Sequence, residues 1–547
     1  MFKKMIAIIT SVIILLTPIQ ASAVTWGEIV TGLQASDTFT SGETAAARTS
    51  EGEYVISGGQ IGDPVEVSEL LQFQFSDSLK VLFQNIKIKQ LNAHEDSGKT
   101  IAVILGSGSE VKGRVNVSAH GKDTNLSLTN EGKMGSLNAI VHNQAQAAIK
   151  NNGEITGGMN NEGHGEGSRL EFVNDKEGRI TGGMDNGVSE KGELVFTNNG
   201  TISGEHLFNG AFDGGMLKNT NNGTINVTNV TNESLHNYAR GGGSFVESTN
   251  NGTINGGVMN QADHEGSRNV AANHGTVNGQ YEFYTGDGGE VVGENNGTVN
   301  SLYAGADGGR VSAVNNGKVK EEIRADASHE SLKADVTVIN NGEADRMIIS
   351  AGENGTLNVE NNGRMTGDGK TRVTVEWEDG EFSRELSGEL SIDAWDKGAT
   401  VNVTNNGSAA AAYIGAADGA NASLKNDGQI GNGEGVPLSS YAAEDGRLMV
   451  TGSGSLEPYT LKMEDGTERT VSMIAQFGGN PSVEEIRRRV GEMVQFDSPG
   501  DYLVMVITQD ENGEDVFRYM PVHIENPQDS EDEDYETYRF RHEMEMK

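Results

Sequence analysis

The sequence predicts an all-β chain that winds as a parallel solenoid, and two observations lead to this prediction. A motif ending in Asn-Asn-Gly or a close variant, such as VNVTNNG at 401–407, recurs along most of the chain. Apolar and polar residues alternate ahead of each motif, which is the spacing of a β-strand rather than a helix. The motif glycines are Gly132, Gly153, Gly178, Gly200, Gly223, Gly252, Gly275, Gly297, Gly317, Gly342, Gly363, Gly407 and Gly428. They follow one another at 20 to 29 residues, with one interval of 44 that we interpret as two periods of 22. A period of this length is typical of solenoids, in which each repeat forms one turn.

The register of the motif predicts that its first asparagine points into the core. Asn405 follows Val403 and Val401 at steps of two, and side chains two residues apart share one face of a strand. A buried amide is costly unless it is hydrogen-bonded, and stacking one asparagine over another gives each amide partners. We therefore expect an internal asparagine ladder formed by Asn130, Asn151, Asn198, Asn221, Asn250, Asn295, Asn315, Asn340, Asn361, Asn405 and Asn426. The glycine that follows is expected to supply the left-handed backbone of a corner.

An antiparallel arrangement is the alternative, because Asn-Gly is also a strong hairpin signal. Hairpins would pair neighbouring strands and need not keep one register over 300 residues. The constant period therefore favours the parallel solenoid.

The N-terminus predicts export. A short basic start, MFKK, precedes an apolar run and the small residues ASA, so residues 1–23 have the form of a signal peptide. The chain has no cysteine, which excludes disulfide stabilisation, and its net charge is −38. Such an acidic chain will not hold nucleic acid by charge attraction. We expect a secreted or cell-surface protein whose mature chain does not insert into a membrane.

The remaining boundaries follow changes of pattern. Residues 24–50 are expected to cap the solenoid, with a short helix at 25–34, and residues 51–435 to form it. A hairpin is expected at 371–386, inserted into the solenoid or lengthening one turn. Residues 436–526 are predicted to be a small β-sandwich-like domain, and the acidic segment 527–547 a disordered tail.

Local signals place three elements in the C-terminal region. Asp465-Gly466 and Asn512-Gly513 each stand between two alternating runs, which predicts two hairpins. Between them, Ser482 and Glu485 form a capping box ahead of apolar residues at helical spacing. A short helix is therefore expected after Ser482.

A column of acidic residues lies ten positions before the motif glycine. Asp213, Asp287, Asp307 and Asp418 belong to it. Carboxylates in a line can bind Ca²⁺, so these four residues are the candidate metal ligands. Most of these acidic residues are closely followed by glycine, and Asp-Gly also suits a tight turn. The turn interpretation is favoured, and no other cofactor is expected.

Catalytic motifs are not found in the sequence. It contains no HExxH, no GxSxG and no cysteine nucleophile. The eleven histidines lie at varying distances from the next motif glycine, so we predict that they form no column. No catalytic residue is assigned, and we expect a non-enzymatic protein.

The repeated NNGTI and NNGTV, within a cysteine-free chain rich in glycine and asparagine, resemble a known class of proteins. They are similar to the right-handed parallel β-helices of bacterial surface adhesins, autotransporter passengers and pectate-lyase-like proteins, over roughly residues 50–435. The resemblance implies a right-handed β-helix with internal asparagine ladders. It implies a monomeric, adhesin-like rod that binds an extracellular carbohydrate or protein. A polysaccharide lyase or glycoside hydrolase and a structural spacer stay open as alternatives.

Overall fold

The structure is a computed structural model of the chain. It describes residues 38–524 apart from 42–43, 49–53, 59–64, 74–78, 97, 228–234, 368–370, 378–379, 387–388, 434, 444, 463–467, 479–480, 498, 511–512 and 514. The signal-peptide segment 1–23, the helix expected at 25–34 and the tail 527–547 lie outside the described residues.

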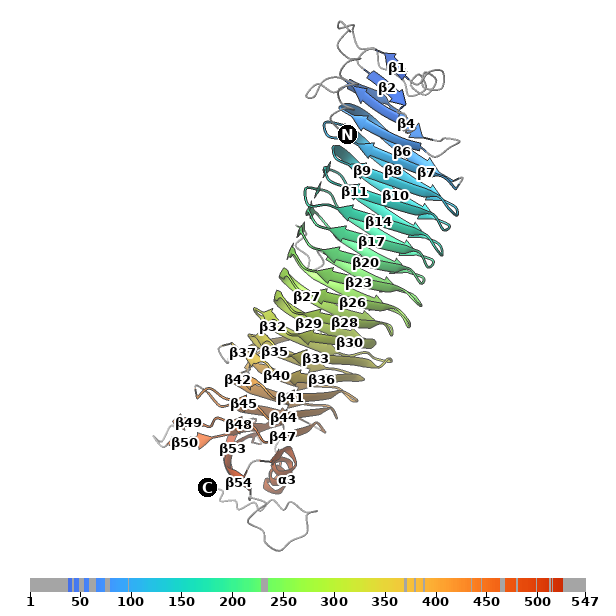
Figure 1. The fold of residues 1–547 in the computed structure, drawn as a ribbon. Helices are drawn as coiled ribbons and strands as arrows, with labels where there is room; N and C mark the ends of the chain where they lie inside the picture. Colours follow the sequence, from blue (N-terminus) through green and yellow to red (C-terminus); the bar gives the residue numbers. More distant parts are fainter. Residues whose placement is uncertain are drawn as a thin grey trace. The chain divides into compact units, whose positions relative to one another are not determined.

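The chain divides into two compact units, Met1–Gly204 and Glu205–Lys547. Each unit is a stack of parallel strands (Figure 1). The structure is 67% strand and 3% helix, and one turn takes about 23 residues. The predicted parallel β-solenoid is therefore confirmed, and the antiparallel alternative for the repeats is wrong.

Residues 1–204 form two sheets. Two strands, β1 (Thr38–Ser41) and β2 (Thr44–Arg48), pair antiparallel and lead into the first sheet. The first sheet continues with β3 (Tyr54–Gly58), β5 (Leu79–Gln84), β7 (Thr100–Leu105), β9 (Asn125–Asn130), β11 (Gln146–Asn151), β14 (Arg169–Asn174) and β17 (Glu193–Asn198). The second sheet contains β4 (Val65–Phe73), β6 (Ile86–Glu95), β8 (Glu110–His120), β10 (Lys133–His142), β12 (Glu154–Ile155), β13 (Met159–His164), β15 (Arg179–Ile180), β16 (Met184–Ser189) and β18 (Thr201–Gly204). From β3 onward, strands pair in parallel with their equivalents one turn away.

Residues 205–547 repeat this plan. The first sheet contains β20 (Met216–Asn221), β23 (Phe245–Asn250), β26 (Arg268–Asn273), β28 (Glu290–Asn295), β30 (Gly309–Asn315), β33 (Ala334–Asn340), β36 (Gly355–Asn361), β41 (Thr400–Asn405), β44 (Asn421–Asn426), β47 (Arg447–Gly452) and β52 (Val494–Phe496). The longer strands of the second sheet are β19 (Leu207–Phe212), β22 (Leu235–Arg240), β25 (Val258–Asp263), β27 (Thr276–Gly286), β29 (Thr298–Asp307), β32 (Glu322–Ala327), β35 (Arg346–Ala351), β40 (Leu390–Ala394), β43 (Ala412–Ala416), β46 (Leu438–Ala442), β51 (Met473–Phe477), β53 (Gly500–Gln509) and β54 (Asp515–Ile524). Its short strands are β21 (Thr224–Val227), β24 (Thr253–Asn255), β31 (Lys318–Val319), β34 (Glu343–Ala344), β37 (Arg364–Met365), β42 (Ser408–Ala409), β45 (Gln429–Ile430) and β48 (Ser455–Leu456).

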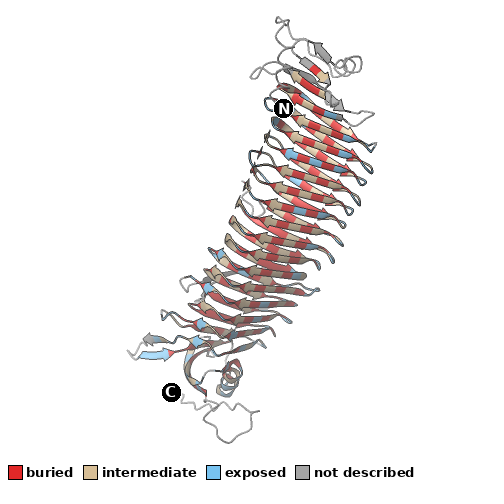
Figure 2. Ribbon diagram, in the orientation of Figure 1, coloured by how far each residue is buried: buried red, intermediate tan, exposed pale blue. Residues whose placement is uncertain are grey.

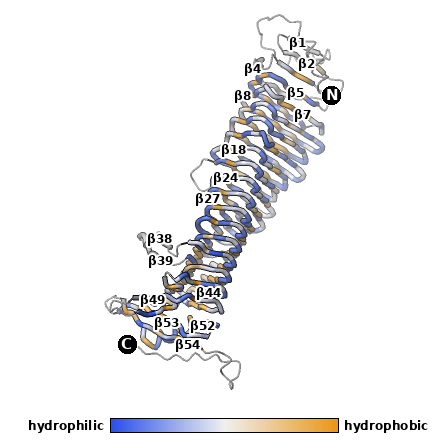
Figure 3. The backbone as a smooth tube through the Cα atoms, turned by 60° about the vertical axis from the view of Figure 1, so that its left-hand side comes forward, coloured by the Kyte–Doolittle hydropathy of each residue, from blue (hydrophilic) through white to orange (hydrophobic). Residues whose placement is uncertain are grey.

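The core of each unit follows from the alternation in its strands. In β17 and β33, for example, every second side chain is buried and the others are half-buried. Figure 2 shows this alternation along the strands, and Figure 3 shows hydrophobic and hydrophilic positions interleaved along the turns. Strand periodicity therefore places one row of side chains inside and the next outside.

The first asparagine of the motif lies inside each unit and is bonded to its equivalents. In residues 1–204 a ladder connects Asn130, Asn151, Asn174 and Asn198. In residues 205–547 a second ladder connects Asn221, Asn250, Asn273, Asn295, Asn315, Asn340, Asn361, Asn405 and Asn426. In both ladders, each Nδ2 donates to the Oδ1 one turn later at 2.7–2.8 Å. The buried amides thus supply one another's hydrogen bonds.

The second residue of several motifs forms another ladder on the exposed side of the corner. It contains Asn296, Asn316, Asn341, Asn362 and Asn406. From Asn316 onward, each of these exposed amides donates from Nδ2 to the Oδ1 one turn earlier, at 2.8–2.9 Å. We call it the outer ladder and the buried ones the inner ladders.

The expected reason for the motif glycine is wrong. The positive-φ glycines of the described residues do not include Gly342, Gly363 or Gly407, so the corner does not need left-handed backbone there. A Cβ on Gly363 would instead collide with the carbonyl oxygen of Gly342, one turn earlier. Glycine is required because successive corners pack backbone against backbone.

The interval of 44 residues is also explained differently. Strand β36 pairs directly with β41, and Asn361 donates to Asn405, so these residues belong to neighbouring turns. The antiparallel hairpin of β38 (Thr371–Trp377) and β39 (Gly380–Leu386) lies between them in the chain. The interval is one long turn carrying a hairpin, and the interpretation as two periods is wrong.

The C-terminal elements occur where local signals predicted them. Strands β49 (Tyr459–Lys462) and β50 (Glu468–Val471) form one hairpin, and β53 and β54 form the other. Helix α3 (Val483–Met493) begins after Ser482, whose Oγ accepts a hydrogen bond from the backbone N–H of Glu485. Parallel pairing continues beyond residue 435, since β46 pairs with β43 and β51 with β46.

Candidate binding face

The outward side of the second sheet in residues 205–547 carries a group of half-buried aromatic side chains. We call it the aromatic face and define it by Phe208, Phe212, His236, Tyr238, Tyr284 and Tyr303. Parallel register brings the first four rings together, because Phe208 pairs with His236 on the next strand. Tyr284 and Tyr303 lie on later strands of the same face. The rings of Phe208 and His236 have centroids 5.5 Å apart, and those of Phe212 and Tyr238 are 5.9 Å apart.

Three of these rings lie over glycine. A Cβ on Gly210 would be 2.6 Å from Cε1 of Phe208 and 2.6 Å from Cε2 of Phe212, so both rings lean across that residue. Tyr303 covers Gly305 in the same way, with Cε1 2.7 Å from the Cβ position. A ring that covers a strand glycine protects the backbone with one side and leaves the other side for a ligand. These rings are flat apolar platforms.

Carboxylates stand between the rings. The hydroxyl of Tyr238 donates to Oδ2 of Asp263 at 2.8 Å, and Nε2 of Gln261 donates to the same oxygen at 2.9 Å. The N–H of Gly286 donates to Oδ1 of Asp263 at 3.0 Å. Burial, and then the hydrogen bond to Asp263, raise the pKa of Tyr238 to about 12. The phenol therefore stays a neutral donor at neutral pH.

The other two tyrosines are also held neutral. Burial, and then the charge of Asp307, raise the pKa of Tyr284 to about 12. Burial, and then the charge of Asp326, raise the pKa of Tyr303 well above its usual value. The aromatic face thus combines neutral rings with carboxylate acceptors.

A hollow of 330 Å³ lies at one side of the aromatic face. It is lined by Gln280, Ser301, Leu302, Tyr303, Glu322 and Arg324. Next to it, Nε of Arg324 contacts Oδ2 of Asp326 at 2.6 Å. Burial raises the pKa of Asp326 despite this guanidinium. A carboxyl group with a raised pKa beside a hollow is a candidate general acid.

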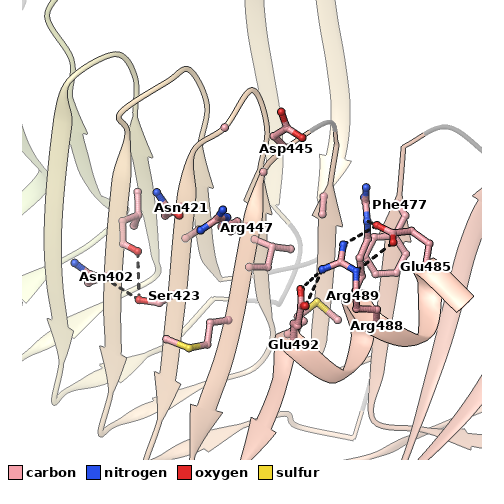
Figure 4. Close-up of a pocket in the computed structure, with 18 residues that line it drawn as sticks. Asn402, Asn421, Ser423, Asp445, Arg447, Phe477, Glu485, Arg488, Arg489 and Glu492 are labelled. Carbon is pink, nitrogen blue, oxygen red and sulfur yellow. Dashed lines mark hydrogen bonds and ion pairs between the residues drawn. The ribbon is translucent and has the colours of Figure 1, made fainter. Parts of the chain in front are cut away.

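A larger groove of 1140 Å³ lies between the first sheet and α3 (Figure 4). Asn402, Asn421 and Arg447 form part of its sheet side. On the helix side, Arg488 contacts both Glu485 and Glu492 at 2.7 Å, as the dashed lines in Figure 4 show. The four charged helix residues that line the groove, Glu485, Arg488, Arg489 and Glu492, are therefore paired with one another within the helix.

Three of the four candidate calcium ligands occupy turns, and the fourth, Asp307, ends β29. Asp213, Asp287 and Asp418 have φ of 48°, 49° and 52°, the left-handed values expected in a tight turn. Asp307 precedes Gly308, which has φ of 76°. Among the described residues no group of three or more histidine, aspartate or glutamate side chains is arranged to hold a metal ion. Calcium binding at this edge stays a prediction.

The prediction that the histidines form no column is wrong. In residues 1–204, His120, His142 and His164 are paired in register on β8, β10 and β13, and the ring of His94 lies next to that of His120. These histidines lie at different sequence distances from the next motif glycine, because the segments between them and that glycine differ in length. Sequence spacing from the glycine therefore does not show that they share one register. Counting forward along the aligned second-sheet strands would have found it.

Sequence reasoning also missed several inward asparagines. Asn174 and Asn273 belong to the inner ladders, but Asp175-Lys176-Glu177 and His274 follow them instead of Asn-Gly. A further buried ladder joins Asn209, Asn237 and Asn260 on the second sheet, at 2.8 Å per step. None of these three precedes a motif glycine.

Comparison with known proteins does not assign this chain to a family. No family model, curated protein or solved structure matches this chain. Within the described residues, no helix has the length and apolar character needed to cross a membrane. The fold and the aromatic face therefore define the chain as a parallel β-solenoid with a candidate binding surface.

Proposed function

We propose that this chain is a non-enzymatic, adhesin-like β-solenoid whose aromatic face binds an extracellular carbohydrate. The observation that supports this most directly is the set of rings lying over Gly210 and Gly305. A sugar ring has one face rich in C–H groups and an edge of hydroxyls. Such a ligand matches flat aromatic platforms bordered by hydrogen-bond acceptors.

The composition of the aromatic face supports a polar ligand rather than an apolar one. Asp263 already accepts hydrogen bonds from Tyr238, Gln261 and Gly286, which fixes its carboxylate beside the rings. A ligand that packs on the rings can therefore also donate hydroxyls to fixed acceptors without ordering new side chains.

The cellular setting is part of the proposal. The signal-like segment at 1–23 and the lack of cysteine support a secreted or surface-exposed protein, and we expect it to act as a monomer. The net charge of −38 makes nucleic acid an unsuitable partner.

Binding of the mature chain, residues 24–547, to a panel of plant, bacterial and host polysaccharides tests the proposal. Tyr303→Ala should weaken retention roughly two- to tenfold, because one aromatic contact contributes roughly 0.5–1.5 kcal/mol. The double variant Phe208→Ala with Phe212→Ala removes two rings and should weaken it further. Phe517→Ala is the matched control, since Phe517 is 54% exposed on β54 and lies outside the aromatic face.

Equal loss in the control variant, or no retention of the native chain on any glycan, would remove the support for carbohydrate binding. The latter result would favour a protein partner or a spacer role.

A polysaccharide lyase or hydrolase is the second candidate, and the raised pKa of Asp326 is the observation that favours it. The same panel should then yield new reducing or unsaturated chain ends. Asp326→Asn should abolish them, because an amide cannot transfer the proton.

A further inference from the structure

Four imidazole rings form a continuous row on the outward side of the second sheet in residues 1–204, with the first pair edge-on, the second tilted and the third stacked. The ring centroids of His94 and His120 are 5.3 Å apart, and both following steps, to His142 and then to His164, are 4.7 Å. The rings of His142 and His164 are nearly parallel, with an interplanar angle of 16°. We call these four residues the histidine column.

The two ends of the histidine column are anchored by hydrogen bonds. Nδ1 of His94 lies 2.7 Å from Oγ of Ser118, and Nδ1 of His164 lies 2.7 Å from Oγ of Ser189. Nε2 of His164 also lies 3.0 Å from Oε2 of Glu162. The two middle rings have no such side-chain bond within the part of the chain that the structure describes.

Carboxylates are concentrated at the ends of the histidine column. Oδ2 of Asp96 lies 3.7 Å from Nε2 of His94, and Lys191 is paired with Glu166 at 3.5 Å. Asp96 also acts electrostatically on His120, and Glu162 and Glu190 act on His142, in each case favouring the protonated ring. Burial and the neighbouring imidazoles outweigh these carboxylates, since the pKa of both middle histidines is lowered.

We propose that the histidine column is an acid-sensitive element, which holds β8, β10 and β13 together while its rings are neutral and loosens them when adjacent rings become protonated. Stacking of neutral rings stabilises neighbouring turns. Two imidazolium ions one turn apart repel each other, and the half-buried site weakens the screening by water.

The direction of the effect follows from the shifted groups. Burial, and then His94, lower the pKa of His120 below 6.5. Burial, and then His164 and His120, lower the pKa of His142 below the same value. A histidine whose pKa is lower in the folded state contributes its full stability above about pH 6.5. This stability is lost as the pH falls from about 6.5 towards the folded pKa.

Hydrogen exchange of the full-length protein at pH 7.5 and 5.0, corrected for the intrinsic pH dependence of exchange, tests the proposal. The opening equilibrium of amides in β8, β10 and β13 should rise several-fold on acidification, because protonation of adjacent rings favours the open state. The double variant His120→Asn with His142→Asn should show no such rise, since asparagine stacks as a neutral group in this fold.

His274→Asn is the matched control. His274 is exposed, and its Nδ1 lies 3.3 Å from Nδ2 of Asn296 in the outer ladder. An asparagine at position 274 would therefore extend the outer ladder by one residue. The control should keep the full acid response in β8–β13. No increase in native opening at pH 5.0, or the same increase in the double variant, would overturn the proposal. His142→Gln provides the same comparison if the double variant is poorly folded.

Discussion

Asn361 shows what a single buried amide does in this fold. Its Oδ1 accepts from Asn340 at 2.8 Å and its Nδ2 donates to Asn405 at 2.7 Å, and the side chain is fully buried. Asn361→Leu removes both bonds and leaves a donor and an acceptor unsatisfied. Each orphaned group costs roughly 1–3 kcal/mol, so the thermal unfolding midpoint should fall clearly.

The neighbouring residue provides the control for that variant. Asn362 belongs to the exposed outer ladder, where water can replace a lost partner. Asn362→Leu should therefore change stability by no more than about 0.5 kcal/mol. Equal midpoints for the two leucine variants would contradict the distinction between inner and outer ladders.

Two glycines allow the cost of close packing to be compared with the cost of a left-handed backbone conformation. A Cβ at Gly363 meets the carbonyl oxygen of Gly342, whereas Gly419 has φ of 80° and open space around its Cβ position. Gly363→Ala should cost about 3 kcal/mol through overpacking, and Gly419→Ala only about 1 kcal/mol. Chemical denaturation measures both, and the reverse order would reject the proposed role of the corner glycines.

At the residue scale, the sequence predicts which side chains point inward, but it does not predict why the motif glycines are required. Stepping back by two from Asn361 finds Val359 and Leu357, and this places the inner ladder correctly. The steric requirement for glycine at position 363 could not be found in this way. It arises from contact with Gly342 one turn earlier, which depends on how closely successive turns stack and not on the residues adjacent in sequence.

Helix α3 is the element whose local signals are clearest. Its N-cap Ser482 bonds the N–H of Glu485, and Ile486 and Val490 are buried on one side. Ser482→Ala should destabilise the helix by about 1 kcal/mol, whereas Ser482→Asp should preserve the cap. Protease susceptibility at 483–493 measures this, and equal cleavage of the two variants would argue against a capping role.

Elements are predictable when their signals are local. The hairpins around Asp465-Gly466 and Asn512-Gly513 and the helix at α3 were found from a few adjacent residues. The histidine column and the aromatic face were not, because their members lie one turn apart. Turns of unequal length shift such residues relative to the motif glycines.

At the scale of the whole molecule, each turn contacts mainly its neighbours. Strand β36 pairs with β33 and β41, and β23 and β26 lie several turns earlier in the same sheet. Solenoid stability is approximately a sum of repeat and nearest-neighbour contributions. Asn361→Leu should therefore accelerate hydrogen exchange in β33, β36 and β41 while β23 and β26 keep native protection. A uniform increase across residues 205–524 would show that the unit opens as a whole.

The period in the sequence predicts the architecture of the molecule but not its binding surface. A repeat of about 23 residues defines the stacking, and turns of other lengths, including the 44-residue turn with the β38–β39 hairpin, keep the same strand pairing. The rings of Phe208 and Tyr238 come from neighbouring turns with no shared motif, and their centroids lie 6.4 Å apart. Their contact depends on the register between strands, which the sequence does not state.

The two kinds of ladder also run in opposite senses. In residues 205–547, Asn340 donates forward to Asn361, whereas Asn341 donates backward to Asn316. Each ladder is a row of aligned amide dipoles, and aligned hydrogen bonds polarise one another. Between Asn295 and Asn406 the two rows lie side by side and point in opposite directions, so their dipoles oppose each other there. Each row can therefore gain cooperative strengthening while the neighbouring row reduces the dipole that builds up along this part of the stack.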